Sequence, residues 1–196
     1  MRAMKDSGIE WIGQIPQEWG TVKVKFTGNY QSGNSITASA IKESGEFPVY
    51  GGNGLRGYTD HFTHNGSHIL IGRQGALCGN VHLVNGTFWA SEHAVVGKIA
   101  ENYDIRYIYY LLDVFNLNRL STTAAQPGIS VEQIVNVIIP KPPQKSIQLH
   151  IADFLDIKCA EIDALIAAKE KTNSLLKERR QSIIYEAVTK SLNPDA

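Results

Sequence analysis

Apolar side chains in the last quarter of the chain recur at alternating spacings of four and three residues. This pattern over more than four heptads predicts the a/d seam of a coiled coil. Its positions are Leu155, Cys159, Ile162, Ile166, Lys169, Asn173, Leu176, Arg180, Ile183 and Ala187. Because residues 144–190 lack glycine and proline, we expect one helix of about 45 residues, roughly 65–70 Å long.

A helix of this length cannot bury its seam against one small domain, so we expect it to pair with a helix of another polypeptide. Lys169, Asn173 and Arg180 are polar at core positions, where such residues cost stability but determine register and orientation. A helix that folds along its own domain is the alternative.

Residues 21–140 combine glycine-rich turns with short strand-like runs, which predicts a mainly β body. We expect a helix at residues 105–117, where apolar side chains share one face, and a stiff linker at 139–143. Asn85-Gly86 predicts a hairpin between two of the strands. The fold class is therefore α+β, with a globular domain at residues 1–143 and a long helix at 144–196. Expected strands are 22–26, 47–50, 68–71, 80–84, 87–90, 94–99 and 134–139.

Composition restricts the cellular compartment and the binding partners that we expect for this chain. The 196 residues carry a net charge of +0, so any anion-binding surface must be local. Cys78 and Cys159 fit no metal or redox spacing and indicate free thiols in a reducing, cytoplasmic compartment. Residues 1–20 have no apolar core of a signal peptide, but Trp11 and Trp19 predict that they pack on the body. We expect no membrane span.

Two glycine-flanked loops present side chains that can hydrogen-bond base edges. Arginine can pair with guanine, and asparagine or glutamine with adenine, through two hydrogen bonds in the DNA major groove. We rank Arg73 and Gln74 first for base contacts and Asn53 and Arg56 next; Lys42 is a phosphate candidate by charge alone. Tight turns with exposed polar tips are the simpler interpretation of both loops.

Other chemistries receive little support. The loop at residues 72–75 lacks the ending of a phosphate-binding loop. His61, His64 and His68 lack a carboxylate or cysteine to complete a metal site, so we expect no metal. Residues 91–93 place serine, glutamate and histidine side by side, but neighbours on a strand point to opposite faces and would not form a catalytic pair. We expect no catalytic residues and no cofactor.

Several segments together resemble the DNA specificity subunit of Type I restriction-modification systems. Each is weak alone, but their order along nearly the whole chain is specific. They are SGIEWIGQIP at 7–16 with Trp19, YGGNG at 50–54, IGRQG at 71–75, AQPGIS at 125–130, IPKPP at 139–143, RQSII at 180–184 and EAVT at 186–189.

The resemblance implies a target recognition domain that reads half of a bipartite site in double-stranded DNA. It also implies a non-catalytic subunit whose helix acts as a spacer and docks modification (methyltransferase) subunits, and indirectly restriction subunits. Family members usually carry two recognition domains and two helical regions, whereas this chain has one of each. We therefore expect two copies to pair through antiparallel helices and to read an interrupted palindrome.

Two alternatives keep the resemblance but change the role. The chain could pair with a different half-subunit encoded elsewhere. It could instead be an interaction module that pairs with another specificity subunit and alters or blocks assembly. The recognised bases and the spacer length do not follow from the sequence, because they depend on how loops and helices are placed in space.

Overall fold

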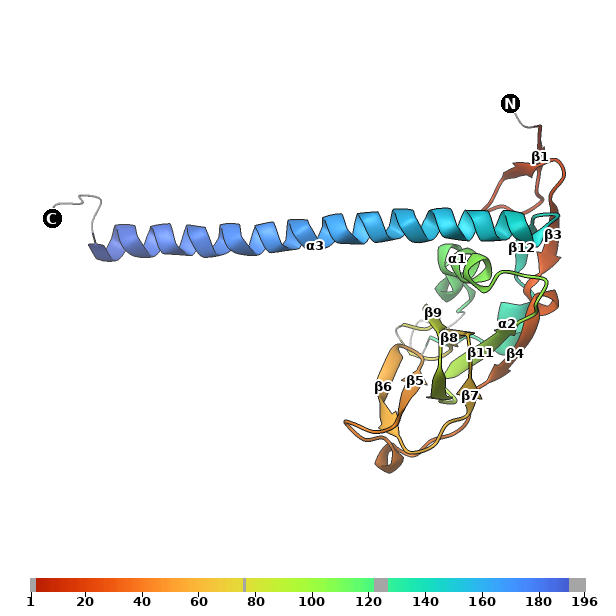
Figure 1. Ribbon diagram of the computed structural model, residues 1–196, viewed down its shortest axis with the longest axis horizontal. Coiled ribbons are helices and arrows are strands. Elements are labelled where there is room, and N and C mark those ends of the chain that lie inside the picture. Colours follow the sequence, from red (N-terminus) through yellow and green to blue (C-terminus); the bar gives the residue numbers. More distant parts are fainter. Residues whose placement is uncertain (1–2, 76, 122–126, 191–196) are drawn as a thin grey trace. The chain divides into compact units, whose positions relative to one another are not determined.

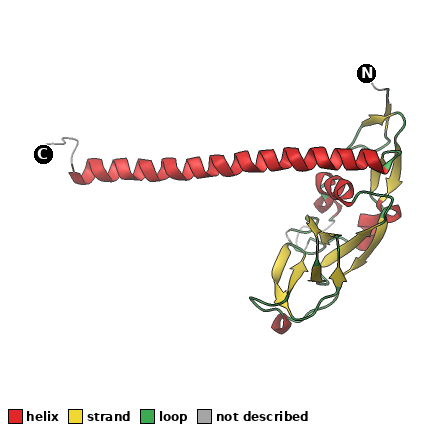
Figure 2. Ribbon diagram, in the orientation of Figure 1, coloured by secondary structure: helices red, strands yellow, loops and turns green. Residues whose placement is uncertain are grey.

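The computed structural model describes residues 3–75, 77–121 and 127–190, and the chain divides into two compact units, residues 1–152 and 153–196. The first unit mixes sheets with short helices, and the described residues of the second are helical (Figures 1 and 2). The α+β class and the long C-terminal helix are confirmed. Residues 125 and 126 of the predicted AQPGIS segment lie outside the described residues.

Two four-stranded sheets form the body of the first unit (Figure 1). Their orders are β6-β5-β10-β7 and β4-β11-β8-β9, and every neighbouring pair is antiparallel except β5 with β10. The strands are β4 (Gly28–Ser32), β5 (Phe47–Gly51), β6 (Gly54–Thr59), β7 (His64–Asn65), β8 (His68–Gly72), β9 (Val81–Val84), β10 (Thr87–Ala90) and β11 (Ala94–Ile99).

The hairpin predicted at Asn85-Gly86 is wrong. Strand β9 pairs with β8, whereas β10 leaves for the other sheet and pairs with β5 and β7. Burial accounts for the choice, because Phe88 and Ala90 of β10 are fully buried in an apolar cluster with Leu70 and Val84. That burial outweighs a turn signal that concerns only the nearest residues.

Strand β8 lies between two apolar clusters. Ile69 and Ile71 point into the larger cluster, and Leu70 points into the smaller one, as alternation along a strand requires. Helix α1 (Ile105–Phe115) packs against β8 and β9 and adds Ile108 and Leu112 to the larger cluster. Because β8 is buried on both faces, the residues that follow it start from a rigid position.

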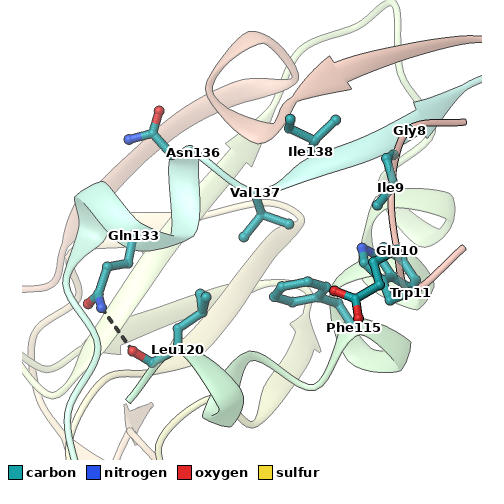
Figure 3. Close-up of a pocket in the computed structure, with 10 residues that line it drawn as sticks. All are labelled: Gly8, Ile9, Glu10, Trp11, Phe115, Leu120, Gln133, Asn136, Val137 and Ile138. Atoms are coloured by element: carbon teal, nitrogen blue, oxygen red, sulfur yellow. Dashed lines mark hydrogen bonds between the residues drawn. The ribbon is translucent and has the colours of Figure 1, made fainter. Parts of the chain in front are cut away.

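The N-terminal residues pack on the body, as predicted. Strands β1 (Met4–Asp6) and β2 (Gln14–Pro16) pair, and between them Trp11 contacts Phe115 of α1 edge-to-face at 5.3 Å between ring centres. A mostly apolar cleft of about 410 Å³ lies beside this contact (Figure 3). Ile138 and Gln133 line it, and Gln133 donates a 2.8 Å hydrogen bond to the carbonyl of Leu120.

Three predicted boundaries differ from the structure. The strand expected at 22–26 is β3 (Gly20–Lys23), followed by a 3-10 helix at Val24–Phe26. The strand expected at 134–139 begins as helix α2 (Val131–Val135), because Ser130 and Gln133 form a reciprocal capping box. The expected linker at 139–143 is largely β12 (Ile138–Lys141), which pairs with β3.

Helix α3 (Lys145–Lys190) is one continuous helix of 46 residues. Its first two turns belong to the first unit, where the Gln148 side-chain oxygen accepts a 2.9 Å hydrogen bond from the amide of Asp104 and Ala152 is fully buried. From Asp153 onward nearly every side chain is exposed or half-buried within its own unit.

Candidate nucleic-acid interface

The two glycine-flanked loops chosen from the sequence lie against each other. A Cβ added at Gly72 would overlap the carbonyl oxygen of Gly52 and lie 2.9 Å from its carbonyl carbon. A Cβ at Gly52 would lie 3.0 Å from the carbonyl oxygen of His93 and 3.4 Å from that of Gln74. Glycine at both positions is therefore what lets the backbones meet.

Three backbone hydrogen bonds connect the loop at residues 73–75 to two other segments of the chain. The amide of Arg73 donates to His93 O at 3.0 Å, and the carbonyl of Arg73 accepts from Ile129 N at 2.9 Å. The amide of Gly75 donates to Pro127 O at 3.0 Å. Segments far apart in the sequence thus fix this loop before any ligand arrives, which reduces the entropy lost on binding.

The side chains of Arg73 and Gln74 are held by separate partners. Arg73 Nη1 donates a 2.7 Å hydrogen bond to Ser32 Oγ, and Arg73 Nε is buried with no hydrogen-bond partner among the described residues. Gln74 Oε1 lies 2.7 Å from His93 Nδ1. The two residues ranked first from the sequence are therefore consecutive in a fixed loop, and each side chain is bonded to a different partner.

Ser32, Glu92 and His93 were not predicted to lie beside Arg73 and Gln74, and Glu92 and His93 were considered only as a catalytic pair. The premise that Glu92 and His93 lie on a strand is wrong, because they occupy the turn between β10 and β11. In that turn the Glu92 carboxylate lies 3.3 Å from His93 Nε2. The pairing of β11 with both β4 and β8 places this turn beside Arg73 and Ser32, and no local signal could have indicated that.

Asn53 and Arg56 lie on the neighbouring loop and strand. Asn53 Oδ1 accepts a 3.4 Å hydrogen bond from Asn80 Nδ2. The aliphatic part of Arg56 covers Gly51, where an added Cβ would lie 3.1 Å from Arg56 Cγ. Since the 51–54 loop touches the 72–75 loop, Asn53 lies at the same end of the strands as Arg73 and Gln74.

Lys42 differs from the other four candidates. Its ammonium group forms an ion pair with the Asp60 carboxylate, and both side chains are more than half exposed. The hydrogen bond and charge of Lys42 lower the pKa of Asp60 below its usual value. A phosphate would have to compete with Asp60 for this cation, which weakens the case for Lys42 as a phosphate contact.

The histidines considered for a metal have another role. The rings of His64 and His68 pack on each other and on Phe88, with ring centres 5.4–5.6 Å apart. Burial lowers the pKa of both imidazoles. Within the described ranges no three histidine, cysteine, aspartate or glutamate side chains are grouped so that they could hold a metal ion. None of the helices described is long and apolar enough to cross a bilayer.

The predicted seam of α3 is exposed within its own unit. The exposed fractions of Ile162, Ile166, Leu176 and Ile183 are 51–59%, and Leu155 is half-buried. Cys159, Lys169, Asn173 and Arg180 are also exposed. In the described part of the chain, no other helix is longer than eleven residues. The seam therefore has no helix of its own chain to pair with there.

Comparison with known proteins identifies the family to which this chain belongs. The profile of the Type I restriction modification DNA specificity domain matches residues 16–177. The chain belongs to this family and is a DNA specificity domain, as its resemblance indicated.

Two curated relatives are specificity subunits. The chain is 41% identical over 130 residues to the Type I restriction enzyme EcoprrI specificity subunit of Escherichia coli, covering 64% of this chain and 32% of that one. It is 28% identical over 121 residues to the putative specificity subunit S.HindORF215P of Haemophilus influenzae, covering 60% and 31%. The match thus spans about a third of the length of these relatives.

Solved structures share the fold. The HsdS subunit from Thermoanaerobacter tengcongensis superposes with a TM-score of 0.67 at 19% identity, covering 96% of this chain and 48% of that one. A structure from work on complex assembly and conformational transition of the type I R-M system gives 0.77 at 19% identity, covering 96% and 49%. The S subunit from M. genitalium gives 0.66 at 20% identity, covering 82% and 44%.

Proposed function

We propose that this domain reads one half of a bipartite DNA target through the loops that carry Arg73 and Gln74. The observation that carries the proposal is the fixed loop at residues 73–75, which carries a guanidinium and an amide on consecutive residues. Those two groups are the ones that read guanine and adenine edges in the major groove. Methylation and cleavage would be carried out by the modification and restriction subunits that the domain directs.

Pairing of two copies through α3 completes the proposed architecture. Antiparallel helices that overlap symmetrically over residues 155–187 bring a positions opposite d positions. In that register Cys159 faces Ile183 of the second copy, and Lys169 faces Asn173 of the second copy. Two-fold symmetry repeats each layer. The two Lys169–Asn173 layers lie at the centre, Arg180 faces Ile162 of the second copy farther out, and these polar layers would set the register.

Substitution of Arg73 tests whether the domain reads the DNA sequence through this side chain. Arg73→Ala is expected to remove about 1–3 kcal/mol of discrimination at one base pair of each half-site and little elsewhere. The measurement is a fluorescence anisotropy titration of the assembly with its modification subunit, against DNA sites varied one base pair at a time. Lys5→Ala, which removes a cation from the exposed strand β1, should leave the preference unchanged. An equal loss on every sequence would make Arg73 a phosphate contact instead, and no preference in the unaltered assembly would refute the function.

The native Cys159 allows a direct test of helix orientation. Cys78 is buried and Cys159 is exposed, so only Cys159 is available for cross-linking. In the antiparallel register, mild oxidation should leave the unaltered chain uncrosslinked but should link the Ile183→Cys variant into dimers, because facing core positions satisfy disulfide geometry. Non-reducing electrophoresis reads the result. Dimers linked through Cys159 alone would indicate parallel helices.

A further inference from the structure

We propose that His93 is a positioning residue that sets the base preference of Gln74, an inference that rests on the DNA-reading function proposed above. A glutamine amide can turn by 180° and exchange its donor and its acceptor, so a free glutamine has no fixed hydrogen-bonding pattern. A neighbour that holds one end of the amide removes this ambiguity. His93 is placed to do so.

The contact fixes which end of the amide is held. Gln74 Oε1 can only accept hydrogen bonds, so His93 Nδ1 donates the 2.7 Å bond. Gln74 Nε2 has no hydrogen-bond partner among the described residues and belongs to an exposed side chain. The amide therefore offers a donor at Nε2 and the second lone pair of Oε1. An adenine edge requires that combination, through its N7 acceptor and its N6 donor.

His93 is itself held in place from two other directions. The Glu92 carboxylate lies 3.3 Å from Nε2, and the backbone of His93 joins the loop because its carbonyl accepts from Arg73 N. The side chain of His93 is 42% exposed. Because Nδ1 donates to Gln74, Nε2 can donate to the Glu92 carboxylate only when the imidazole carries both protons, and in that form the ring is held at both nitrogens. This support extends from Glu92 through His93 to Gln74, and it needs no contact between His93 and a base.

The test compares His93→Leu with His93→Asn in the assembly that contains the modification subunit. Leucine removes the donor, whereas the asparagine amide can place an N–H near the position of Nδ1. His93→Leu should reduce discrimination about tenfold at the base pair that Gln74 reads, and His93→Asn should restore most of it. His61→Leu, which removes an exposed histidine of the same unit, should not alter the preference.

A double-mutant cycle separates positioning from direct contact. If His93 acts through Gln74, His93→Leu has no further effect in a Gln74→Ala background. An undiminished effect there, or one at a different base pair, would show that His93 touches DNA itself and would overturn the proposal. So would an equal loss of affinity for all sequences, which is the result of a merely structural role. Absence of preference in the unaltered assembly would instead refute the proposed function.

Discussion

Ile166→Asp is expected to convert the proposed dimer into monomers at low micromolar concentration. Ile166 is 51% exposed in its own unit and occupies a core position of the proposed pair, opposite Leu176 of the second copy. Two-fold symmetry places the aspartate in two layers of one dimer. Desolvation costs several kcal/mol per buried unpaired ion, and a loss of about 4 kcal/mol raises a dimer dissociation constant roughly 1,000-fold.

The matched control is Ile157→Asp, on the opposite side of the same helix. Ile157 lies two residues from Leu155, about 200° around the helix axis, and is 59% exposed. Both substitutions add the same charge and have the same effect on helix propensity, so only the seam position differs. Light scattering after size exclusion measures the mass of each variant. If Ile166→Asp remained dimeric, or if both variants became monomeric, the assigned seam would be incorrect.

Gly72→Ala is expected to destabilise the first unit and to abolish sequence preference. The new Cβ would overlap the Gly52 carbonyl oxygen and lie 3.1 Å from Leu77 O. These are backbone atoms, which cannot move aside as a flexible side chain can. Overpacking of this kind costs up to about 3 kcal/mol, which corresponds to a fall in Tm of roughly 6–12 °C for a chain of this size.

Gly20→Ala serves as the control for this substitution. Gly20 lies in β3, has no heavy atom within 4 Å of an added Cβ, and does not have positive φ. Its melting temperature and its DNA preference should stay at their starting values. Calorimetry and the anisotropy titration measure the two effects separately. A Gly72→Ala variant that melted normally and kept its preference would mean that the two loops need not touch.

The elements best predicted from the sequence are those whose signals are repeated. The seam of α3 recurs through ten positions, so its three polar residues do not hide it. Strands β8 and β11 were predictable because a short apolar run between turn residues is typical of a buried strand. By contrast, α2 depends on one capping box, and β12 resembled a linker because prolines at 140, 142 and 143 concealed its pairing with β3.

The long helix, the α+β class and two residues of the candidate site, Arg73 and Gln74, could be predicted from the sequence. Those features follow from spacing and from side-chain chemistry, which are local properties. The positions of Ser32, Glu92 and His93 beside these two residues depend on the fold. Strand β11 pairs with β4 on one side and β8 on the other, and this brings the three residues to the site. Such long-range pairing is selected by the apolar surface that the whole fold buries. Burial of apolar side chains also explains why β10 pairs with β5 and not with β9, although Asn85-Gly86 is the strongest local turn signal in the chain.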